Sequence, residues 1–217
     1  MLLSRTTTIS LVSLIVLTAI ALTYLTNRPP PPENLVIADA SQPIFALIYV
    51  AEAKGFFADE GLEVSYLKFT SGRDALASVI NGDADVATVL ETPIVLNVGK
   101  GNRMRILSTL HTSNKNTAIF ARRDRGIKTP GDLKGKRIGV SPNTNGEFFL
   151  RQFLVNEEIA LESVELVNVK PQDMVMSLTN GDVDAVATWN PHLLKVRNKF
   201  PERLDDYVGE ANPVRVV

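Results

Sequence analysis

The 217-residue chain contains no cysteine and only two histidines, His111 and His192. The lack of cysteine excludes a disulfide scaffold, a thiolate metal site, a cysteine nucleophile and a lipid-modified N-terminal cysteine. The two histidines show no metal-ligand spacing, and His192, which follows Pro191 at a predicted helix start, is expected on the surface. A formal net charge of −1 leaves no basic footprint for nucleic acid. We therefore expect no catalytic residues, no metal, no cofactor and no nucleic-acid partner.

The N-terminus carries an apolar run, residues 9–25, with nothing more polar than Ser, Thr and Tyr. This run follows the single positive charge of Arg5 and is typical of either a cleaved signal peptide or an uncleaved transmembrane helix. Ala19 and Ala21 form a pair that signal peptidase could read, whereas the length of the run favours an anchor. Four prolines at 29–32 form an extended spacer. Both alternatives place the remaining chain in the periplasm or on the outer face of the cytoplasmic membrane.

After residue 34, short apolar runs alternate with segments of helical period, which is typical of an α/β protein. The predicted strands are 35–39, 62–67, 85–89, 104–110, 117–121, 137–140, 164–169, 184–188 and a last strand at 214–217. The predicted helices are 45–57, 74–81, 93–99, 146–157, 171–180 and 191–198.

An internal repeat organises this pattern. Residues 62–85, shifted by 99 positions, match residues 161–184 with nine identities in 24 positions. Each copy is predicted to be strand, loop, helix, turn and strand, with Gly82 and Gly181 ending the helices in a left-handed conformation. The repeat predicts two similar lobes, each with its own mixed, mostly parallel sheet.

Ligands of open parallel sheets bind beyond the carboxyl ends of the strands, so the loops at these ends are the candidate site. Each loop taken alone is more simply explained by turns and helix caps, but several loops converging from two lobes favour a cleft. Trp189 could either floor that cleft or pack in the core. The aspartates at the helix ends, Asp83, Asp85, Asp182 and Asp184, are predicted to serve turns rather than acid–base chemistry.

Five segments in order, 51–64, 70–87, 127–140, 143–154 and 180–193, resemble the solute-binding proteins of ABC importers for nitrate, aliphatic sulfonates, taurine and thiamine precursors. The resemblance implies a type II periplasmic binding protein fold, a small and often anionic solute held between the lobes, an ABC permease as partner, and no enzymatic activity. The ligand-binding residues that it implies are Ser41, Gln42, Ser71, Gly72, Glu91, Thr92, Asn143, Thr144, Asn145, Trp189 and Asn190. The alternative is a membrane-tethered sensory domain of the same fold.

The resemblance also predicts the domain organisation. We expect a signal peptide or anchor at 1–28, the proline spacer at 29–34, lobe 1 at 35–111, lobe 2 at 112–207 and the start of a return to lobe 1 at 208–217. The family pattern continues beyond such a return, so the first lobe is expected to be incomplete and truncated at its C-terminal side.

Overall fold

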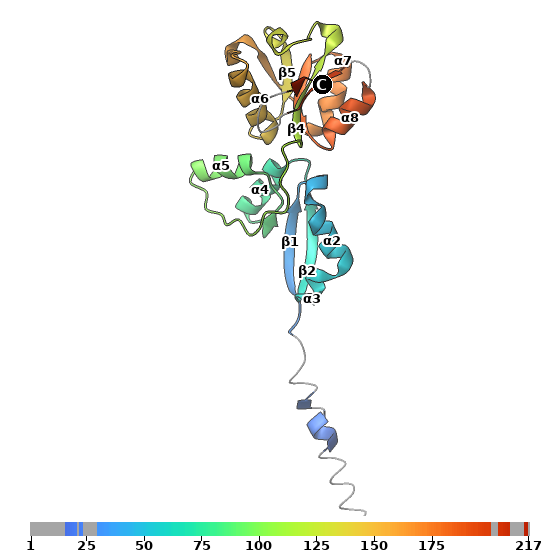
Figure 1. Cartoon of the computed structure of the whole chain (residues 1–217). Coiled ribbons are helices and arrows are strands. Elements are labelled where there is room, and N and C mark those ends of the chain that lie inside the picture. The colour runs from blue at the N-terminus through green and yellow to red at the C-terminus, as the bar shows by residue number, and fades with distance from the viewer. Residues whose placement is uncertain (1–15, 21, 24–29, 201–203, 209–214, 217) are drawn as a thin grey trace, which may run out of the picture.

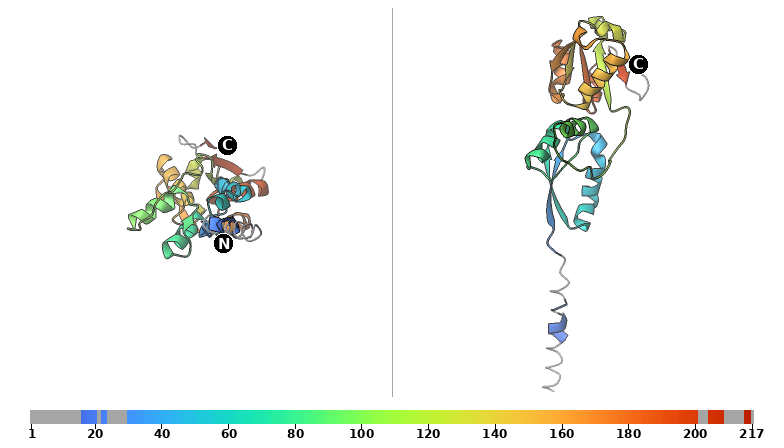
Figure 2. Two further views of the ribbon diagram at one scale, coloured as in Figure 1. Left: turned by 90° about the horizontal axis from the view of Figure 1, so that it is seen from below. Right: turned by 90° about the vertical axis from the view of Figure 1, so that its left-hand side faces the viewer.

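The computed structural model describes residues 16–20, 22–23, 30–200, 204–208 and 215–216. Those from Glu33 onward form two α/β lobes stacked along the long axis of the molecule (Figure 1). The first lobe contains the elements from β1 to α5, and the second contains those from β4 to β9. A long segment without regular structure connects them along one side, as Figure 2 shows. The predicted α/β class with two lobes is confirmed.

The first lobe has a three-stranded parallel sheet in the order β2-β1-β3. Its strands are β1 (Glu33–Asp39), β2 (Leu62–Lys68) and β3 (Val86–Ala87). Its helices are η1 (Pro43–Phe45), α2 (Ala46–Lys54), α3 (Phe56–Asp59), α4 (Gly72–Asn81) and α5 (Glu91–Gly99). The single helix predicted at 45–57 is interrupted, because Gly55 adopts a left-handed conformation with φ of 76° and ends α2.

The second lobe has a six-stranded mixed sheet in the order β6-β5-β7-β4-β8-β9. Its strands are β4 (Thr117–Arg122), β5 (Arg137–Val140), β6 (Glu165–Asn168), β7 (Ala185–Trp189), β8 (Leu204–Val208) and β9 (Arg215–Val216). The α-helices are α6 (Asn145–Asn156), α7 (Met174–Asn180) and α8 (His192–Lys199). Short 3-10 turns complete it: η2 (Arg123–Arg125), η3 (Pro130–Leu133), η4 (Leu161–Ser163) and η5 (Pro171–Asp173).

Helices cover both faces of this second sheet, with α6 on one side and α7 and α8 on the other (Figure 1). Residues of β4 alternate between the two faces: Ile119 packs in the cluster under α6, and Phe120 packs in the cluster under α7 and α8. Two separate hydrophobic clusters therefore stabilise this lobe.

The internal repeat is confirmed in three dimensions. Gly82 and Gly181 both adopt left-handed conformations, with φ of 84° and 81°, at the ends of α4 and α7. Asp85 Oδ2 accepts from the Val36 N–H at 2.8 Å, and Asp184 Oδ2 accepts from the Arg137 N–H at 3.0 Å. The aspartates thus join each turn to the neighbouring strand, as the turn interpretation predicts.

The predicted strand at 104–110 is wrong, because this segment has no regular structure and leaves Ile106 71% and Leu107 76% exposed. The counterpart of this segment under the 99-residue shift is 203–209, which contains β8. β8 pairs with the antiparallel β4, but in the first lobe the described residues offer no such neighbour, and a strand needs a ladder partner.

The last strand also differs from the expectation. Of residues 214–217 the structure describes Arg215 and Val216, which form β9. They pair with β8 at the edge of the second sheet, instead of returning to the first lobe.

Most of the predicted signal or anchor segment lies outside the described residues. Residues 16–20 and 22–23 of it are helical. Within the part of the chain that the structure describes, no helix combines the length and apolar character needed to cross a bilayer.

Candidate functional site

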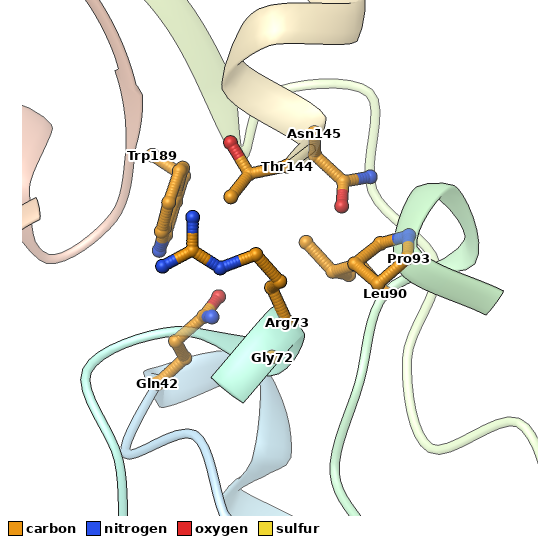
Figure 3. Close-up of a pocket in the computed structure, with 8 residues that line it drawn as sticks. All are labelled: Gln42, Gly72, Arg73, Leu90, Pro93, Thr144, Asn145 and Trp189. Atoms are coloured by element: carbon orange, nitrogen blue, oxygen red, sulfur yellow. The ribbon is translucent and has the colours of Figure 1, made fainter. Parts of the chain in front are cut away.

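A small pocket lies between the two lobes at the carboxyl ends of the parallel strands (Figure 3). This is where the strand topology predicts a ligand site. Its lining residues are Gln42, Gly72, Arg73, Leu90, Pro93, Thr144, Asn145 and Trp189. Five come from the first lobe and three from the second, so neither lobe forms the site alone.

The first-lobe wall is built by the beginnings of two helices and the loop after β1. Gln42 follows β1, while Gly72 and Arg73 begin α4 directly after its N-cap, Ser71. Leu90 caps α5. A Cβ on Gly72 would lie 3.2 Å from Val89 Cα, so glycine allows α4 to start close to the chain that leads into α5.

The second-lobe wall is built by the start of α6 and the end of β7. Thr144 is the N-cap of α6, but its hydroxyl donates to the Ser141 carbonyl at 2.7 Å and caps no N–H of the helix. Gly146 allows α6 to approach β7, since a Cβ there would lie 2.8 Å from the Ala187 carbonyl oxygen. The uncapped amino end of α6 therefore points at the pocket with its positive dipole.

Trp189 belongs to both the core and the pocket. It is the last residue of β7, it is 2% exposed, and its indole lines the pocket wall opposite Leu90 and Pro93 (Figure 3). The two alternatives for this residue are therefore compatible.

The surface position predicted for His192 is wrong. His192 is 7% exposed and meets Trp189 edge to face, with ring centroids 6.0 Å apart. It is covered because α8 packs back onto β7 and β4. Burial, together with the charge of Lys195, lowers the pKa of His192 to about 4, so its imidazole is neutral at pH 7.

Arg73 is the only ionisable residue among the eight that line the pocket. Its guanidinium projects from α4 toward Trp189 and donates to the Pro142 carbonyl of the second lobe at 2.9 Å (Figure 3). It also pairs with Asp74 at 2.9 Å. Burial alone would raise the pKa of Asp74, but the hydrogen bonds from Arg73 and Ser71 outweigh it and hold this pKa below its ordinary value.

Two buried polar atoms of the pocket residues have no hydrogen-bond partner among the described residues, Gln42 Oε1 and Trp189 Nε1. A second bond between the lobes lies beside the pocket, where Asn145 Nδ2 donates to Glu91 Oε1 at 2.9 Å. The pocket thus combines one cation, one helix amino end, an unused donor and an unused acceptor. Buried polar atoms are normally satisfied, so the unused pair marks this pocket as a place for a polar ligand.

The sequence-predicted residues divide into two groups. Those that line the pocket are Gln42, Gly72, Thr144, Asn145 and Trp189, and those that do not are Ser41, Ser71, Glu91, Thr92, Asn143 and Asn190. Within the second group Ser71 caps α4, and Glu91 holds Asn145 across the lobes. The N–H of Asn190 donates to the Asn116 carbonyl at 3.0 Å.

Sequence reasoning missed three lining residues, Arg73, Leu90 and Pro93. Each lies within one residue of a predicted one. Extending the predicted loops into the first helical turn would have found Arg73 and Pro93, whereas Leu90 directly precedes α5.

Comparison with known proteins identifies the family of the chain. The family model described as "NMT1/THI5 like" matches residues 42–215. The taurine-binding periplasmic protein of Escherichia coli is 27% identical over 143 residues, which cover 65% of this chain and 44% of that protein. The chain spans about half the length of the curated relatives that it matches.

Solved structures establish the fold. The alkanesulfonate-binding protein of Xanthomonas axonopodis, solved with MOPS, matches with a TM-score of 0.65 and 15% identity over 82% of this chain and 61% of that one. The periplasmic nitrate-binding protein of Synechocystis matches with a TM-score of 0.65 and 18% identity, over 82% of this chain and 52% of that one. The predicted periplasmic binding protein architecture is thereby confirmed.

Proposed function

The chain belongs to the NMT1/THI5-like family, and we propose that it binds a small anionic solute between its lobes and delivers it to the permease of an ABC importer. The names of its relatives support solute binding, since they describe proteins for taurine, alkanesulfonate and nitrate. These three solutes share a compact, negatively charged oxyanion or sulfonate group. That shared chemistry is what the pocket must recognise.

The composition of the pocket carries the proposal. Arg73 supplies a positive charge, and the uncapped start of α6 supplies N–H groups and a positive dipole end. Trp189 Nε1 adds a buried donor without a partner. Arg73 pairs with Asp74, but it is the only ionisable residue among the eight that line the pocket, so an acceptor-rich anion fits the pocket better than a cation.

The experiment titrates the full chain in detergent with taurine, nitrate or ethanesulfonate and follows the fluorescence of Trp189, the single tryptophan. We expect at least one anion to change the emission and choline to leave it unchanged. Arg73→Gln should weaken binding of that anion by about 2 kcal/mol, or about thirtyfold, because a charge-assisted hydrogen bond is lost.

Lys100→Gln is the matched control, since it removes an exposed cation from the end of α5 in the same lobe. Its affinity should equal that of the wild type. Equal affinity of the Arg73→Gln variant would contradict the anion assignment, and no response to any anion would contradict solute binding itself.

Placement outside the cytoplasm is part of the proposal. It is supported by the apolar run at 9–25 and by relatives described as periplasmic. If the run is an uncleaved anchor, carbonate-washed membranes retain the protein at full length. A soluble extracytoplasmic form that begins after residue 21 indicates a cleaved signal, and a cytoplasmic product contradicts the placement.

A further inference from the structure

A buried carboxylate stands three residues before Gln42, at the end of the strand that leads to the first-lobe wall of the pocket. Asp39, the last residue of β1, is 0% exposed. Its Oδ2 accepts from the Tyr49 hydroxyl at 2.6 Å and from Lys68 Nζ at 2.7 Å, and its Oδ1 accepts from the Thr88 hydroxyl at 3.2 Å. Asp39, Ser41, Tyr49, Lys68 and Thr88 form what we call the Asp39 cluster.

The Lys68 ammonium is held on several sides. It lies 5.0 Å from the ring centroid of Tyr49 and 4.7 Å from that of Tyr66, as well as against Asp39. Burial alone would raise the pKa of Asp39, but hydrogen bonds from Lys68, Tyr49 and Ser41 outweigh it and lower this pKa. The carboxylate is therefore charged at neutral pH and fully engaged.

The cluster forms hydrogen bonds with the backbone that follows β1. The Ala40 N–H donates to Thr88 Oγ1 at 2.8 Å, and the Ser41 N–H donates to Asp39 Oδ1 at 3.1 Å. Ser41 is one of three residues other than glycine with positive φ among those described, at 50°. This conformation is unfavourable for a residue with a Cβ, so side-chain bonds are needed to hold it.

Gln42 directly follows Ser41. It is 3% exposed, its Oε1 has no partner among the described residues, and its side chain reaches into the pocket (Figure 3). Because Oε1 makes no bond of its own, the direction of this side chain depends in part on the backbone that carries it.

The second lobe repeats the arrangement. Asn143 has φ of 59°, and its N–H donates to Glu147 Oε2 at 2.7 Å. Thr144, the next residue, lines the pocket. In each lobe, a carboxylate thus binds the N–H of a left-handed residue directly before a pocket residue.

We propose that Asp39 is a positioning residue of the solute site, which fixes Ser41 in its left-handed conformation and thereby orients Gln42 toward the solute. This inference rests on the proposed function in so far as Gln42 contacts the solute. Asp39 itself does not line the pocket.

A double-mutant cycle tests the coupling between Asp39 and Gln42. The variants are Asp39→Asn, which keeps the shape of the side chain but replaces one acceptor oxygen by a donor, Gln42→Ala, and their combination. With the anion that the wild type binds among taurine, nitrate and ethanesulfonate, each single variant should lose about tenfold in affinity. The combination should lose no more than Gln42→Ala alone, because Asp39 acts through Gln42. The proposal would be overturned if the loss of affinity in the double variant equalled the product of the two single losses. It would also be overturned if Asp39→Asn left the affinity unchanged.

A second readout needs no solute. The side-chain amide of Gln42, assigned in ¹H–¹⁵N spectra by its disappearance in Gln42→Ala, should move toward the position of an exposed, averaged glutamine in Asp39→Asn. An unmoved Gln42 resonance overturns the positioning role. If no anion binds the wild type, the proposed function fails, and this resonance still decides the positioning role.

Asp184→Asn is the matched control, because it removes an ion-paired carboxylate of the second lobe at the opposite end of its parallel strands from the pocket. It should lower stability but leave both the affinity and the Gln42 resonance unchanged. If Asp39→Asn does not fold, Thr88→Val removes the hydroxyl that joins Asp39 to the Ala40 N–H while keeping the buried shape. It should move the same resonance in the same direction by a smaller amount.

Discussion

The two lobes contain the same three-stranded parallel unit but differ in what is built beside it. The order β2-β1-β3 in the first lobe equals β6-β5-β7 in the second, where β4, β8 and β9 are added next to β7. β3 is thus a two-residue edge strand of half-buried residues, whereas all five residues of its counterpart β7 are buried. The burial of a strand therefore depends on its neighbours as much as on its own sequence.

The cores follow the same difference. The first lobe buries one cluster, made of four alanines and one phenylalanine, and the second buries two clusters that contain Phe120, Phe153 and several Leu, Ile and Val residues. Among the described residues, nine exposed large hydrophobic residues belong to the first lobe, including Leu47, Val50 and Val95, and four belong to the second. Stability should accordingly be concentrated in the second lobe.

The largest expected effect comes from truncating a phenylalanine in each core. Phe153→Ala, in the cluster under α6, should lower the free energy of unfolding by about 3–5 kcal/mol, and Phe45→Ala in the first lobe should cost clearly less because fewer large side chains surround it. Urea unfolding followed by circular dichroism measures both. Phe148→Ala, on the exposed face of α6, is the control and should change stability by about 0.5 kcal/mol or less. Equal costs for Phe45 and Phe153 would remove the proposed asymmetry.

The repeated aspartates provide the next comparison. Asp184 pairs with Arg137 and is buried, whereas Asp85 is exposed. Asp184→Asn should therefore cost about 1.5–3 kcal/mol, and Asp85→Asn about 1 kcal/mol or less.

The pH dependence of stability distinguishes an ionic from a purely steric role of Asp184. Burial alone would raise the pKa of Asp184, but the bonds from Arg137 outweigh it and hold this pKa below the ordinary 3.8. Its contribution should be complete above pH 3.8 and disappear as the pH falls through the lowered pKa. A gap between wild type and Asp184→Asn that persists in acid would contradict the ionic role.

The third comparison concerns glycines that allow a helix to pack closely against its neighbour, and its expected effects are smaller. Gly146→Ala places a Cβ against the Ala187 carbonyl oxygen and 3.3 Å from the Trp189 ring, and should cost about 1–3 kcal/mol and shift the Trp189 emission. Gly72→Ala meets its nearest atom at 3.2 Å and should cost less. Gly99→Ala, with open space around it, should be neutral or stabilise by about 0.4–1 kcal/mol. A shifted emission in Gly99→Ala would show that the signal is not specific to α6.

The smallest effect concerns the joint between the lobes. Glu91→Ala removes the acceptor of Asn145 and should weaken closure by about 0.5–1.5 kcal/mol, which small-angle scattering would detect as a larger radius of gyration. Glu91→Gln keeps an acceptor oxygen and should scatter like the wild type. If both variants open equally, the charge of Glu91 rather than its hydrogen bond holds the lobes together.

Periodicity and the repeat predicted most of the fold, because each unit is stabilised by local signals. Gly82 and Gly181 end helices through their backbone freedom, and Asp85 and Asp184 join turns to strands, all within a short span of sequence. The failure at 104–110 has the opposite cause. Its apolar residues suit a strand, but strand formation depends on a neighbour far away in the sequence.

The site was predicted at the level of loops rather than of atoms. Gln42, Gly72, Thr144, Asn145 and Trp189 were predicted and line the pocket. Asn143 and Ser41, in contrast, were predicted but do not line the pocket. Both have left-handed backbone conformations, which the sequence did not indicate. The burial of His192 depends on the packing of α8 against β7, and no local pattern reports such packing.

The residues shared by the two copies of the repeat and the residues that line the pocket have no member in common. Gly72 and Arg73 lie inside the repeated unit, yet Pro171 and Gln172 stand at the matching positions of the other copy. Several identical residues, such as Asn81 and Gly82 with Asn180 and Gly181, end their helices on the side away from the pocket. The identical Asp74 comes nearer, since it pairs with Arg73 without lining the pocket itself. Substitutions that change solute preference can thus occur at one set of positions while the other set preserves the architecture. A duplicated scaffold of this kind can change the solute that it binds without losing its fold.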